Sequence, residues 1–418
     1  MPSSSIADPR LARAGRDRIE WADAQMPVLR SIRERFESEK PMTGVGIAAC
    51  LHVTAETANL LRALAAAGAR VALCAANPLS TQDDVAASLR ANYGVEVRAA
   101  HGESAVTAAE HLAALVASEP QITLDDGADL VGAVHDGAAG AAEKLLGALE
   151  ETTTGLLRLR AMHASGRLRC PVVAVNEAQA ERIFSDRYGT GQSTLDGILR
   201  AANVLLAGQT FVVLGYGWTG QGIALRARGA GASVIVCEVD PLRALEARME
   251  GFEVMPALKA AERGDVFVTV SGNRDVLRGE HFRRMKDGAV LANAGHFDVE
   301  INLSELAALA VGGSRAVRPL VEQFDLGDRR LNLLTQGRVV NLAAAEGHPA
   351  AVMDVSFAIQ ALTCEHVVAH AGTLPRGVHP VPDDINRATA MLKLAALGVE
   401  IDELSEAQKR YQRGWAPG

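Results

Sequence analysis

Three glycines near the middle of the chain have the spacing of a dinucleotide-binding loop. Gly215, Gly217 and Gly220 form the pattern G-x-G-x-x-G within FVVLGYGWTGQGIAL, between an apolar run and a stretch with helical periodicity. The first glycine allows the tight turn, the second lets the backbone approach a pyrophosphate, and the third lets the helix pack on the strand. The free N–H groups at the start of the helix would then face the phosphates.

An acidic residue follows at the position that distinguishes the two nicotinamide dinucleotides. Glu238 lies in the next expected strand, 233–239, about 20 residues after Gly215. A carboxylate there accepts hydrogen bonds from the ribose hydroxyls and repels a 2′-phosphate. Because strand, glycines, helix, strand and acid occur in this order, the sequence predicts NAD as the cofactor. The alternative is an α/β domain with a glycine-rich turn and no ligand.

The elements that must position this loop alternate along the whole chain. Strands are expected at 44–53, 70–75, 95–99, 120–125 and 171–176, and again at 210–214, 233–239, 266–270, 289–293 and 339–342. Amphipathic helices are expected at 57–67, 82–92 and 220–229. This alternation, which restarts near Gln209, predicts an α/β protein with two doubly wound, Rossmann-like parallel sheets. The Pro-rich stretch 373–383 is expected to lead into a helical C-terminal tail.

The composition excludes several classes of protein. Of the 418 residues, 48% are hydrophobic and 22% charged, and the net charge is -8, which predicts a globular protein that binds neither nucleic acid nor membrane. The five cysteines are scattered, so neither a metal site nor a disulfide framework is expected. No signal peptide is apparent, and the most membrane-like segment, 60–76, contains two arginines. We therefore expect a cytoplasmic protein.

Six further segments resemble the S-adenosylhomocysteine hydrolase (adenosylhomocysteinase) family in its short prokaryotic form. They read CLHVTAET (50–57), NPLSTQDD (77–84), LDDGADL (124–130), EETTTG (150–155), NAGHFDVEI (293–301) and EGHPAAVMD (346–354). Matching segments follow the family's order from residue 18 to Trp415. The C-terminal extension of the longer forms, which reaches a neighbouring subunit's NAD, is absent.

The resemblance implies an architecture and an assembly. A substrate-binding domain would comprise residues 1–190 and 350–383, and an NAD-binding Rossmann domain, 191–349, would be inserted into it. Residues 384–418 would form an oligomerisation tail, and a homotetramer is expected because members of the family are usually tetramers.

The resemblance also implies a reaction. In the family, tightly held NAD oxidises the ribose 3′-hydroxyl of an adenine nucleoside, and the new ketone acidifies the hydrogen at C4′. A base removes that hydrogen, the 5′ substituent leaves by elimination, and the hydrolases then add water and reduce the ketone again. The expected partner is therefore an adenine nucleoside.

Roles for individual residues follow from the same resemblance. His52 would lie near the 5′ position and Asp126 would remove the C4′ proton, with Glu151 and His296 beside the sugar and nicotinamide. The adenine pocket would contain Thr54, Glu56, His348 and Met353. The remaining cofactor contacts would come from Thr152, Thr153, Thr154, Asn273, Asn293 and Asn341.

One segment, VNEAQAERIFSDRYGTGQSTLDGI, departs from the family. Glu181 stands where the hydrolases have a lysine that touches O3′, and Ser185 and Asp186 replace an Asp-Asn pair that holds the sugar. In a water-poor pocket, such carboxylates raise each other's pKa. Glu181 is then either a base for the sugar hydroxyl or a ligand for an additional hydroxyl of the substrate. Neutralisation by Arg182 or Arg187, with weak survival of the usual reaction, is the third interpretation.

Three functions remain open from the sequence. The first is a nucleoside dehydratase that oxidises the 3′-type hydroxyl and eliminates water at C5′ to leave an exocyclic enol ether, as in the conversion of angustmycin C to the antibiotic angustmycin A. The second is an S-adenosyl-L-homocysteine hydrolase with a variant site. The third is an NAD-bound protein without catalytic activity. The altered sugar site favours the first, and the whole-chain resemblance favours the second.

Overall fold

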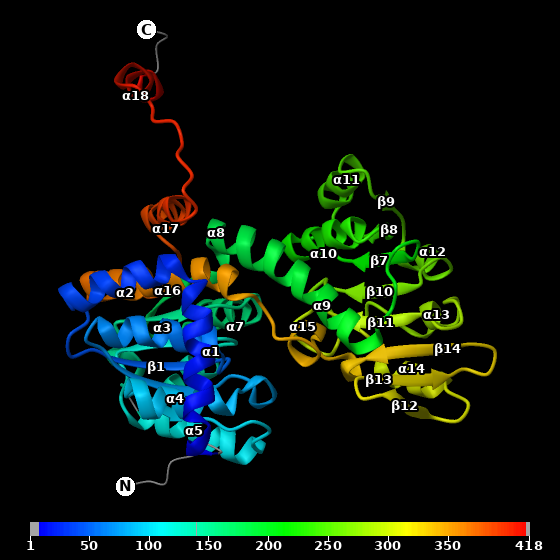
Figure 1. Cartoon of the computed structure of the whole chain (residues 1–418), viewed down its shortest axis with the longest axis horizontal. Coiled ribbons are helices and arrows are strands. Elements are labelled where there is room, and N and C mark those ends of the chain that lie inside the picture. The colour runs from blue at the N-terminus through cyan, green and yellow to red at the C-terminus, as the bar shows by residue number, and fades with distance from the viewer. Residues whose placement is uncertain (1–7, 139, 415–418) are drawn as a thin grey trace.

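The computed structural model of the chain describes residues 8–138 and 140–414. Figure 1 shows two lobes, each built around one β-sheet, and a C-terminal tail that leaves the first lobe. The first seven residues of the predicted substrate domain and the last four of the predicted tail, including Trp415, lie outside the described residues.

The first lobe contains a seven-stranded sheet in which every pair of neighbours is parallel. In spatial order the strands are β15 (Gly377–Pro380), β6 (Pro171–Ala174), β5 (Gly147–Glu150), β4 (Ile122–Asp125), β1 (Gly46–Leu51), β2 (Arg70–Ala75) and β3 (Glu96–Arg98). The main helices are α1 (Ala12–Ala24), α2 (Pro27–Glu39), α3 (Ala55–Ala66), α4 (Asp83–Tyr93), α5 (Ala105–Ala117), α6 (Asp129–Asp136), α7 (Thr153–Ala164) and α16 (Ala350–Ala369). The central strands are short, continuously buried apolar runs, as expected when helices cover both faces.

The second lobe contains an eight-stranded sheet that is parallel except at one edge. In spatial order its strands are β12 (Ser314–Arg318), β13 (Val321–Asp325), β14 (Arg330–Leu334), β11 (Val290–Asn293), β10 (Val266–Thr269), β7 (Thr210–Leu214), β8 (Ser233–Cys237) and β9 (Glu253–Val254). The strands β12, β13 and β14 pair antiparallel. The helices are α9 (Gly191–Ala202), α10 (Trp218–Gly229), α11 (Pro241–Met249), α12 (Ala257–Ala261), α13 (Gly279–Phe282), α14 (Leu303–Leu309) and α15 (Val340–Ala343).

The predicted fold class is confirmed, but two predicted elements are wrong. Residues 339–342 form the start of helix α15 instead of a strand, and Val339 makes only an isolated bridge to Asn293. A short buried apolar run has no periodicity that separates the two structures. The stretch 373–383 is not merely a connection, because it contains β15, which pairs with β6 at the edge of the first sheet. An edge strand tolerates the prolines of this stretch.

Helix α16 is the central helix of the first lobe's core. Phe357, Ile359 and Cys364 are buried in one cluster with residues of α2, α3 and β1. Among the described residues, α16 is the single helix long and apolar enough to cross a membrane, so the prediction that 60–76 is the most membrane-like segment was wrong. Since 61% of the apolar stretch of this helix is buried in the protein, its apolar character is explained by its place in the core.

The predicted tail begins as part of the first lobe and then leaves it. Helix α17 (Asp383–Ala396) packs against α16, and the Lys393 ammonium lies 2.8 Å from the fully buried carboxylate of Asp354. Helix α18 (Glu406–Arg413) stands away from both lobes in Figure 1. The segment between the two helices exposes Val399, Ile401 and Leu404.

A π-helical segment, Arg182–Thr190, connects the first lobe to the second and continues directly into α9. Helix α10 packs closely on it: a Cβ atom on Gly222 would lie 1.8 Å from the carbonyl oxygen of Arg187. Single π-helical turns inside α-helices occur frequently at functional sites. The segment places the carboxyl ends of strands from both sheets around one cavity.

Candidate active site

One large cavity, of about 1450 Å³, lies between the two lobes. Many of its lining residues directly follow strands β1, β4, β5, β7, β8, β10 and β11. In open α/β sheets the carboxyl ends of the strands are the usual place for ligands. All the predicted site residues except Gly220 and Asn293 line this cavity.

A histidine and an aspartate form a close pair on the first lobe's side. His52 follows β1 and Asp126 follows β4, and His52 Nε2 lies 3.2 Å from Asp126 Oδ2. Burial alone would lower the pKa of His52, but the charge and hydrogen bond of Asp126 outweigh it and raise that pKa. Burial would likewise raise the pKa of Asp126, but His52 lowers it, with smaller contributions from His296 and His348. The pair therefore favours imidazolium and carboxylate.

Two buried acids lie next to this pair. Burial, followed by the charges of Glu181 and Asp126, raises the pKa of Glu151 well above its ordinary value. Burial also raises the pKa of Glu181, although the neighbouring hydroxyl groups of Ser185 and Ser356 partly offset it. The Ser356 hydroxyl donates to Glu151 Oε1 at 3.0 Å, whereas Glu181 Oε2 is buried with no hydrogen-bond partner. That oxygen is free to accept a hydrogen bond from a ligand.

The π-helical segment contributes two more predicted residues. Burial, followed by the charge of Glu181, raises the pKa of Asp186 to about 7, and Arg182 opposes the shift. The Ser185 hydroxyl lies 3.1 Å from Nδ1 of His348, while Thr190 Oγ1 lies 2.8 Å from its Nε2. Burial and the charge of His52 lower the pKa of His348 to about 4, although Asp126 opposes the shift, so this imidazole is neutral. His348 therefore links the two chain segments that join the lobes.

Threonines cap two of the helices that begin at the cavity. Thr54 is the N-cap of α3 and accepts a hydrogen bond from the backbone N–H of Thr57, and Glu56 lies in the first turn. Burial is the main cause that raises the pKa of Glu56. Thr152 caps α7 in the same way, with 3.1 Å from its hydroxyl to the Gly155 nitrogen. The caps fix these side chains at the cavity wall.

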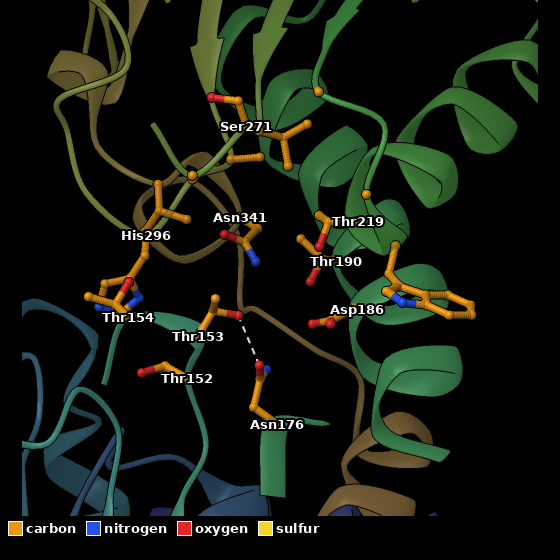
Figure 2. Close-up of a pocket in the computed structure, with 18 of the residues that line it drawn as sticks. Thr152, Thr153, Thr154, Asn176, Asp186, Thr190, Thr219, Ser271, His296 and Asn341 are labelled. Carbon is orange, nitrogen blue, oxygen red and sulfur yellow. Dashed lines mark hydrogen bonds between the residues drawn. The ribbon is translucent and has the colours of Figure 1, made fainter. Parts of the chain in front are cut away.

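Residues of both lobes face the same space in Figure 2. Thr153 and Asn176 belong to the first lobe and are joined by a hydrogen bond of 2.9 Å. His296 and Asn341 belong to the second lobe. Asn341 donates to Ser193 at 3.2 Å, and its carbonyl oxygen is buried without a partner. Thr154 and Met353 complete this part of the wall.

The glycine-rich loop fits a dinucleotide. Gly215 has φ +111°, and a Cβ there would lie 2.8 Å from the Val270 carbonyl oxygen, so the turn requires glycine. Gly217 is the N-cap of α10 and offers no side-chain hydrogen bond, which leaves the N–H groups of the first turn for a phosphate. A Cβ on Gly220 would lie 2.1 Å from the carbonyl oxygen of Gly215. Gly220 thus permits the contact between strand and helix.

The acid at the end of β8 is held at the edge of this loop. Glu238 accepts hydrogen bonds from the backbone N–H groups of Tyr216 and Val239, both at 2.6 Å. The loop that contains Asn273, which also lines the cavity, is fixed by Glu300, which accepts from the Ser271 nitrogen at 2.9 Å. Loop, helix start and acid therefore have the arrangement that NAD requires.

Asn293 lies outside the cavity wall. Its amide nitrogen donates to three backbone carbonyl groups, and its oxygen accepts from the Thr269 hydroxyl and the Gly295 nitrogen. The side chain thus shapes the loop that presents His296, and its predicted contact with the cofactor stays a prediction.

Three supporting residues were not predicted as site residues. Ser80 Oγ lies 2.5 Å from His52 Nδ1, Ser356 contacts Glu151, and Glu300 holds the Ser271 loop. Ser80 falls within the family-like segment NPLSTQDD, which could have indicated it. Ser356 lies on α16, about 200 residues from its partner, and no spacing in the sequence indicates that contact.

Comparison with known proteins connects this site to one family. Residues 186–347 match the family model described as S-adenosyl-L-homocysteine hydrolase, NAD binding domain, and residues 3–146 match the model described as S-adenosyl-L-homocysteine hydrolase. The chain is 57% identical to the adenosylhomocysteinase of Aquifex aeolicus, with 99% of each chain covered. It is 50% identical to the S-inosyl-L-homocysteine hydrolase of Methanopyrus kandleri, with 99% of this chain and 98% of that one covered.

Similarity to solved structures supports the fold. A dipicolinate synthase polypeptide from Bacillus halodurans superimposes with a TM-score of 0.51 at 13% identity, over 79% of this chain and 99% of that chain. At this identity the likeness concerns the arrangement of the two sheets alone.

Proposed function

The chain belongs to the S-adenosyl-L-homocysteine hydrolase family, and from that premise we propose that it oxidises a sugar hydroxyl of an adenine nucleoside and eliminates the substituent at C5′. When bound at the glycine loop, NAD, the cofactor of the family, would supply the reversible hydride acceptor that this chemistry needs. The proposal is supported by the composition of the cavity, where the dinucleotide loop of one lobe faces a His–Asp pair and buried acids of the other.

We assign to Glu181 the role of the base that accepts the proton of the sugar hydroxyl. Its carboxyl group is buried, its Oε2 has no partner, and burial raises its pKa. A general base is most effective when its pKa lies close to the working pH. Glu181 would accept this proton during oxidation and return it during the final reduction.

We assign the elimination to Asp126 and His52. Asp126, whose pKa is lowered mainly by His52 against the effect of burial, is ionised and removes the hydrogen at C4′. His52, whose pKa Asp126 raises against the effect of burial, is protonated and donates to the leaving group. The 3.2 Å separation then lets the C4′ proton pass from Asp126 to His52. When the leaving group is the 5′-hydroxyl, one C–H and one C–O bond break, a C=C bond forms, and water leaves.

Water is the leaving group that we propose, and the observation that carries this choice is the buried Glu181. The hydrolases have a lysine at this position, whereas here Glu181, Glu151 and Asp186 form an acidic site for sugar hydroxyls. Such a site suits a substrate with an additional hydroxymethyl group, whose hydroxyl can donate to one of the other two carboxyl groups, Glu151 or Asp186. The enzyme would then be a nucleoside dehydratase that forms an exocyclic enol ether, as in the conversion of angustmycin C to angustmycin A.

The similar proteins favour a second candidate. Relatives that share 50–57% of the sequence over nearly their whole length are named adenosylhomocysteinase or S-inosyl-L-homocysteine hydrolase. By similarity alone, hydrolysis of S-adenosyl-L-homocysteine is therefore better supported than dehydration. In that reaction water would add to the same alkene, and Glu181 would have to replace the family's lysine. Glu56, as an acceptor for an amino group, suits adenine better than hypoxanthine.

The deciding experiment supplies the NAD-loaded enzyme with S-adenosyl-L-homocysteine, adenosine or angustmycin C in separate reactions. Products are identified by mass spectrometry, and released homocysteine is measured with a thiol reagent. We expect angustmycin C to lose one water and S-adenosyl-L-homocysteine to release no homocysteine. Asp126→Asn is the inactive control.

Two other outcomes would overturn the dehydratase. Homocysteine and adenosine released at turnover rates, without dehydration, would establish the hydrolase. No product from any nucleoside, with NAD still bound, would establish a binding protein. Glu181→Lys tests the importance of the buried Glu181. If the enzyme is a dehydratase, we expect this variant to lose the reaction with angustmycin C.

We further propose a homotetramer in which the C-terminal tail mediates assembly. The apolar side chains of Ile401 and Leu404 are exposed in a tail that stands away from the lobes, and exposed apolar clusters of this kind often contact another protomer.

A further inference from the structure

Two buried carboxyl groups lie directly behind the cavity. Asp125 ends β4 and Glu150 ends β5, and the parallel strands are paired in register at these two residues. Successive side chains of a strand point to opposite faces. Asp126 and Glu151 therefore enter the cavity, while Asp125 and Glu150 lie buried on its far side. The mechanism above uses neither of these two buried groups.

Glu150 ties together the loops that carry the cavity's acids. Its Oε1 accepts hydrogen bonds from the Gly127 nitrogen at 2.9 Å, the Thr152 nitrogen at 2.9 Å and the Thr152 hydroxyl at 2.7 Å. Gly127 directly follows Asp126, and Thr152 directly follows Glu151. One oxygen atom thus fixes both loops, while Oε2 of the same carboxyl is buried without a partner.

Asp125 has a backbone hydrogen-bond donor for each of its two oxygens. Its two oxygens accept from the backbone nitrogens of Leu130 at 2.9 Å and Val131 at 2.7 Å, in the first turn of α6. The positive end of a helix dipole stabilises a negative charge at this position. Glu150 also lies at the start of a helix, α7, but all its hydrogen bonds reach Oε1 and none reaches Oε2. The negative charge of the pair is therefore better placed on Asp125, where both oxygens accept a hydrogen bond.

The surroundings add more negative charge than positive. Asp129 at the start of α6 and Asp126 in the cavity both repel a charge on Asp125. Arg158 of α7 contacts the Gly127 carbonyl but is half exposed and is paired with Asp129. Gly155 of α7 closes the site behind Glu150, because a Cβ there would lie 2.2 Å from the carboxyl carbon. Two carboxylates that share a site this dry do not both ionise readily.

The directions of the pKa shifts agree with this geometry. Burial raises the pKa of Glu150 to about 8, with a further contribution from the charge of Asp125, although its three hydrogen bonds oppose the shift. Burial raises the pKa of Asp125 to about 7, and the hydrogen bonds from Leu130 and Val131 oppose it. Glu150 thus keeps its proton to the higher pH.

We propose that Glu150 is a positioning residue that acts as a neutral acid, with Asp125 carrying the single negative charge of the pair. The proton stays on Oε2, and Oε1 holds the loops of Asp126 and Glu151 at their places in the cavity. Ionisation of Glu150 adds a second charge beside Asp125, and we expect the repulsion between the two carboxylates to displace the Glu150 carboxyl group and with it the loops that it holds. The catalytic consequence rests on the proposed function, whereas the protonation state does not.

The first test compares Glu150→Gln with Glu150→Ala in the NAD-loaded enzyme. The alanine variant lacks the oxygen that ties the loops, and we expect it to lose about 100-fold in kcat, the effect of a displacement of about 1 Å. The glutamine variant keeps a neutral acceptor, and we expect it to recover most of that loss. Its kcat should also persist to higher pH than that of the wild type, because no proton can leave. A glutamine variant as impaired as the alanine variant would overturn the proposal.

The second test needs no substrate. A carboxyl with a raised pKa in the folded state binds more protons than in the unfolded state, so its contribution to stability falls as the pH rises from its ordinary value to about 8. The thermal midpoint of Glu150→Gln minus that of the wild type should therefore increase between pH 5 and about 8. Glu110→Gln, on the exposed side of α5, is the matched control and should give a constant difference.

The two tests separate the possible failures. A difference in thermal midpoint that does not change with pH, or that decreases, shows that Glu150 is ionised in the folded protein and overturns the proposal. When no nucleoside is converted by the wild type, the proposed function fails, and the thermal comparison still decides the state of Glu150.

Discussion

His52 owes its proton to one neighbour. Burial alone would lower the pKa of this imidazole, and the Asp126 carboxylate, 3.2 Å from Nε2, reverses the effect. Ser80 holds the other ring nitrogen, so the ring has a fixed orientation toward Asp126. The pair is therefore a prepared proton donor for a poor leaving group such as hydroxide.

Asp126→Asn should convert His52 into a neutral imidazole near pH 7. Without the carboxylate, burial is unopposed, and we expect the pKa of His52 to fall below its ordinary value. NMR titration of the ring protons measures this directly. Glu110→Gln, far from the cavity wall, should leave the titration unchanged. A His52 pKa that stays raised in Asp126→Asn would contradict the assignment.

Glu181→Gln should stabilise the protein increasingly as the pH rises toward 7. Burial and then the charge of Glu181 raise the pKa of Asp186 to about 7, so the stability that Asp186 contributes falls between its ordinary value and pH 7. Removing the neighbouring charge lowers this pKa. The free energy of unfolding of the variant minus that of the wild type, measured in urea, should therefore be larger at pH 7 than at pH 5 by about 1–2 kcal/mol.

Glu177→Gln is the matched control for that measurement. Glu177 also lines the cavity, but its hydrogen bond to Arg160 lowers its pKa. The stability that Glu177 contributes is therefore nearly complete above its ordinary pKa of 4.5, and the difference between this variant and the wild type should hardly change between pH 5 and pH 7. The same pH trend in both variants would show that the loss of any one negative charge at the cavity causes the effect, and that the interaction of Glu181 with Asp186 does not.

At the scale of elements, the carboxyl ends of strands and the first turns of helices position the side chains of the site. His52, Asp126 and Glu151 each follow a parallel strand of one sheet, and their strands are neighbours in the order β5, β4, β1. Thr54 and Thr152 then cap the helices that follow β1 and β5. Because parallel strands end at one edge, residues about 100 positions apart in the chain meet there without any dedicated loop.

Gly220→Ala should weaken NAD binding through a shift of helix α10. The new methyl group would lie 2.1 Å from the Gly215 carbonyl oxygen, so the helix must move away from the loop that receives the pyrophosphate. We expect an affinity loss of about 10- to 100-fold, equivalent to about 1.4–2.7 kcal/mol, in a calorimetric titration of cofactor-free protein with NAD.

Gly229→Ala, at the other end of the same helix, is the matched control. A Cβ there meets no atom within 4 Å, so NAD affinity should be unchanged and stability should rise by up to about 1 kcal/mol. Equal affinities for the two variants would show that the packing of α10 does not determine cofactor binding.

The helices and strands that could be predicted from the sequence are those whose local residue pattern favours the same structure as their tertiary surroundings. Strands such as 70–75 and 210–214 are uninterrupted apolar runs between turn residues, and the structure has them as β2 and β7. Strand β5 escaped prediction because Gly147 and Glu150 are unfavourable strand residues, and only its neighbours β4 and β6 stabilise it. Likewise, β15 contains Pro380 and depends on pairing with β6.

The candidate site was predictable where the chemistry lies in short motifs. The glycine loop, Glu238 and the departure at Glu181 could be read from adjacent letters of the sequence. The tie from Glu150 to Gly127 and the contact of Ser356 with Glu151 could not, because they depend on which strands and helices become neighbours.

At the scale of the whole molecule, the tail provides a test of assembly. Ending the chain after Gly398 removes α18 and the exposed Ile401 and Leu404, and leaves α17 on the first lobe. If the tail joins protomers, light scattering should show a tetramer for the full chain and a smaller species for the truncated one. Circular dichroism checks that the lobes remain folded, and an unchanged mass would place the interface elsewhere.

The position of β15 has a consequence for synthesis on the ribosome. Its partner β6 emerges about 200 residues earlier, and the whole second lobe is translated between them. At about 5–20 residues per second, the edge of β6 stays unpaired for roughly 10–40 seconds. During that interval α16, which fills the core of the first lobe, is also missing. The second lobe is complete in sequence before the first one, so the nascent chain carries an open sheet edge until its last part arrives.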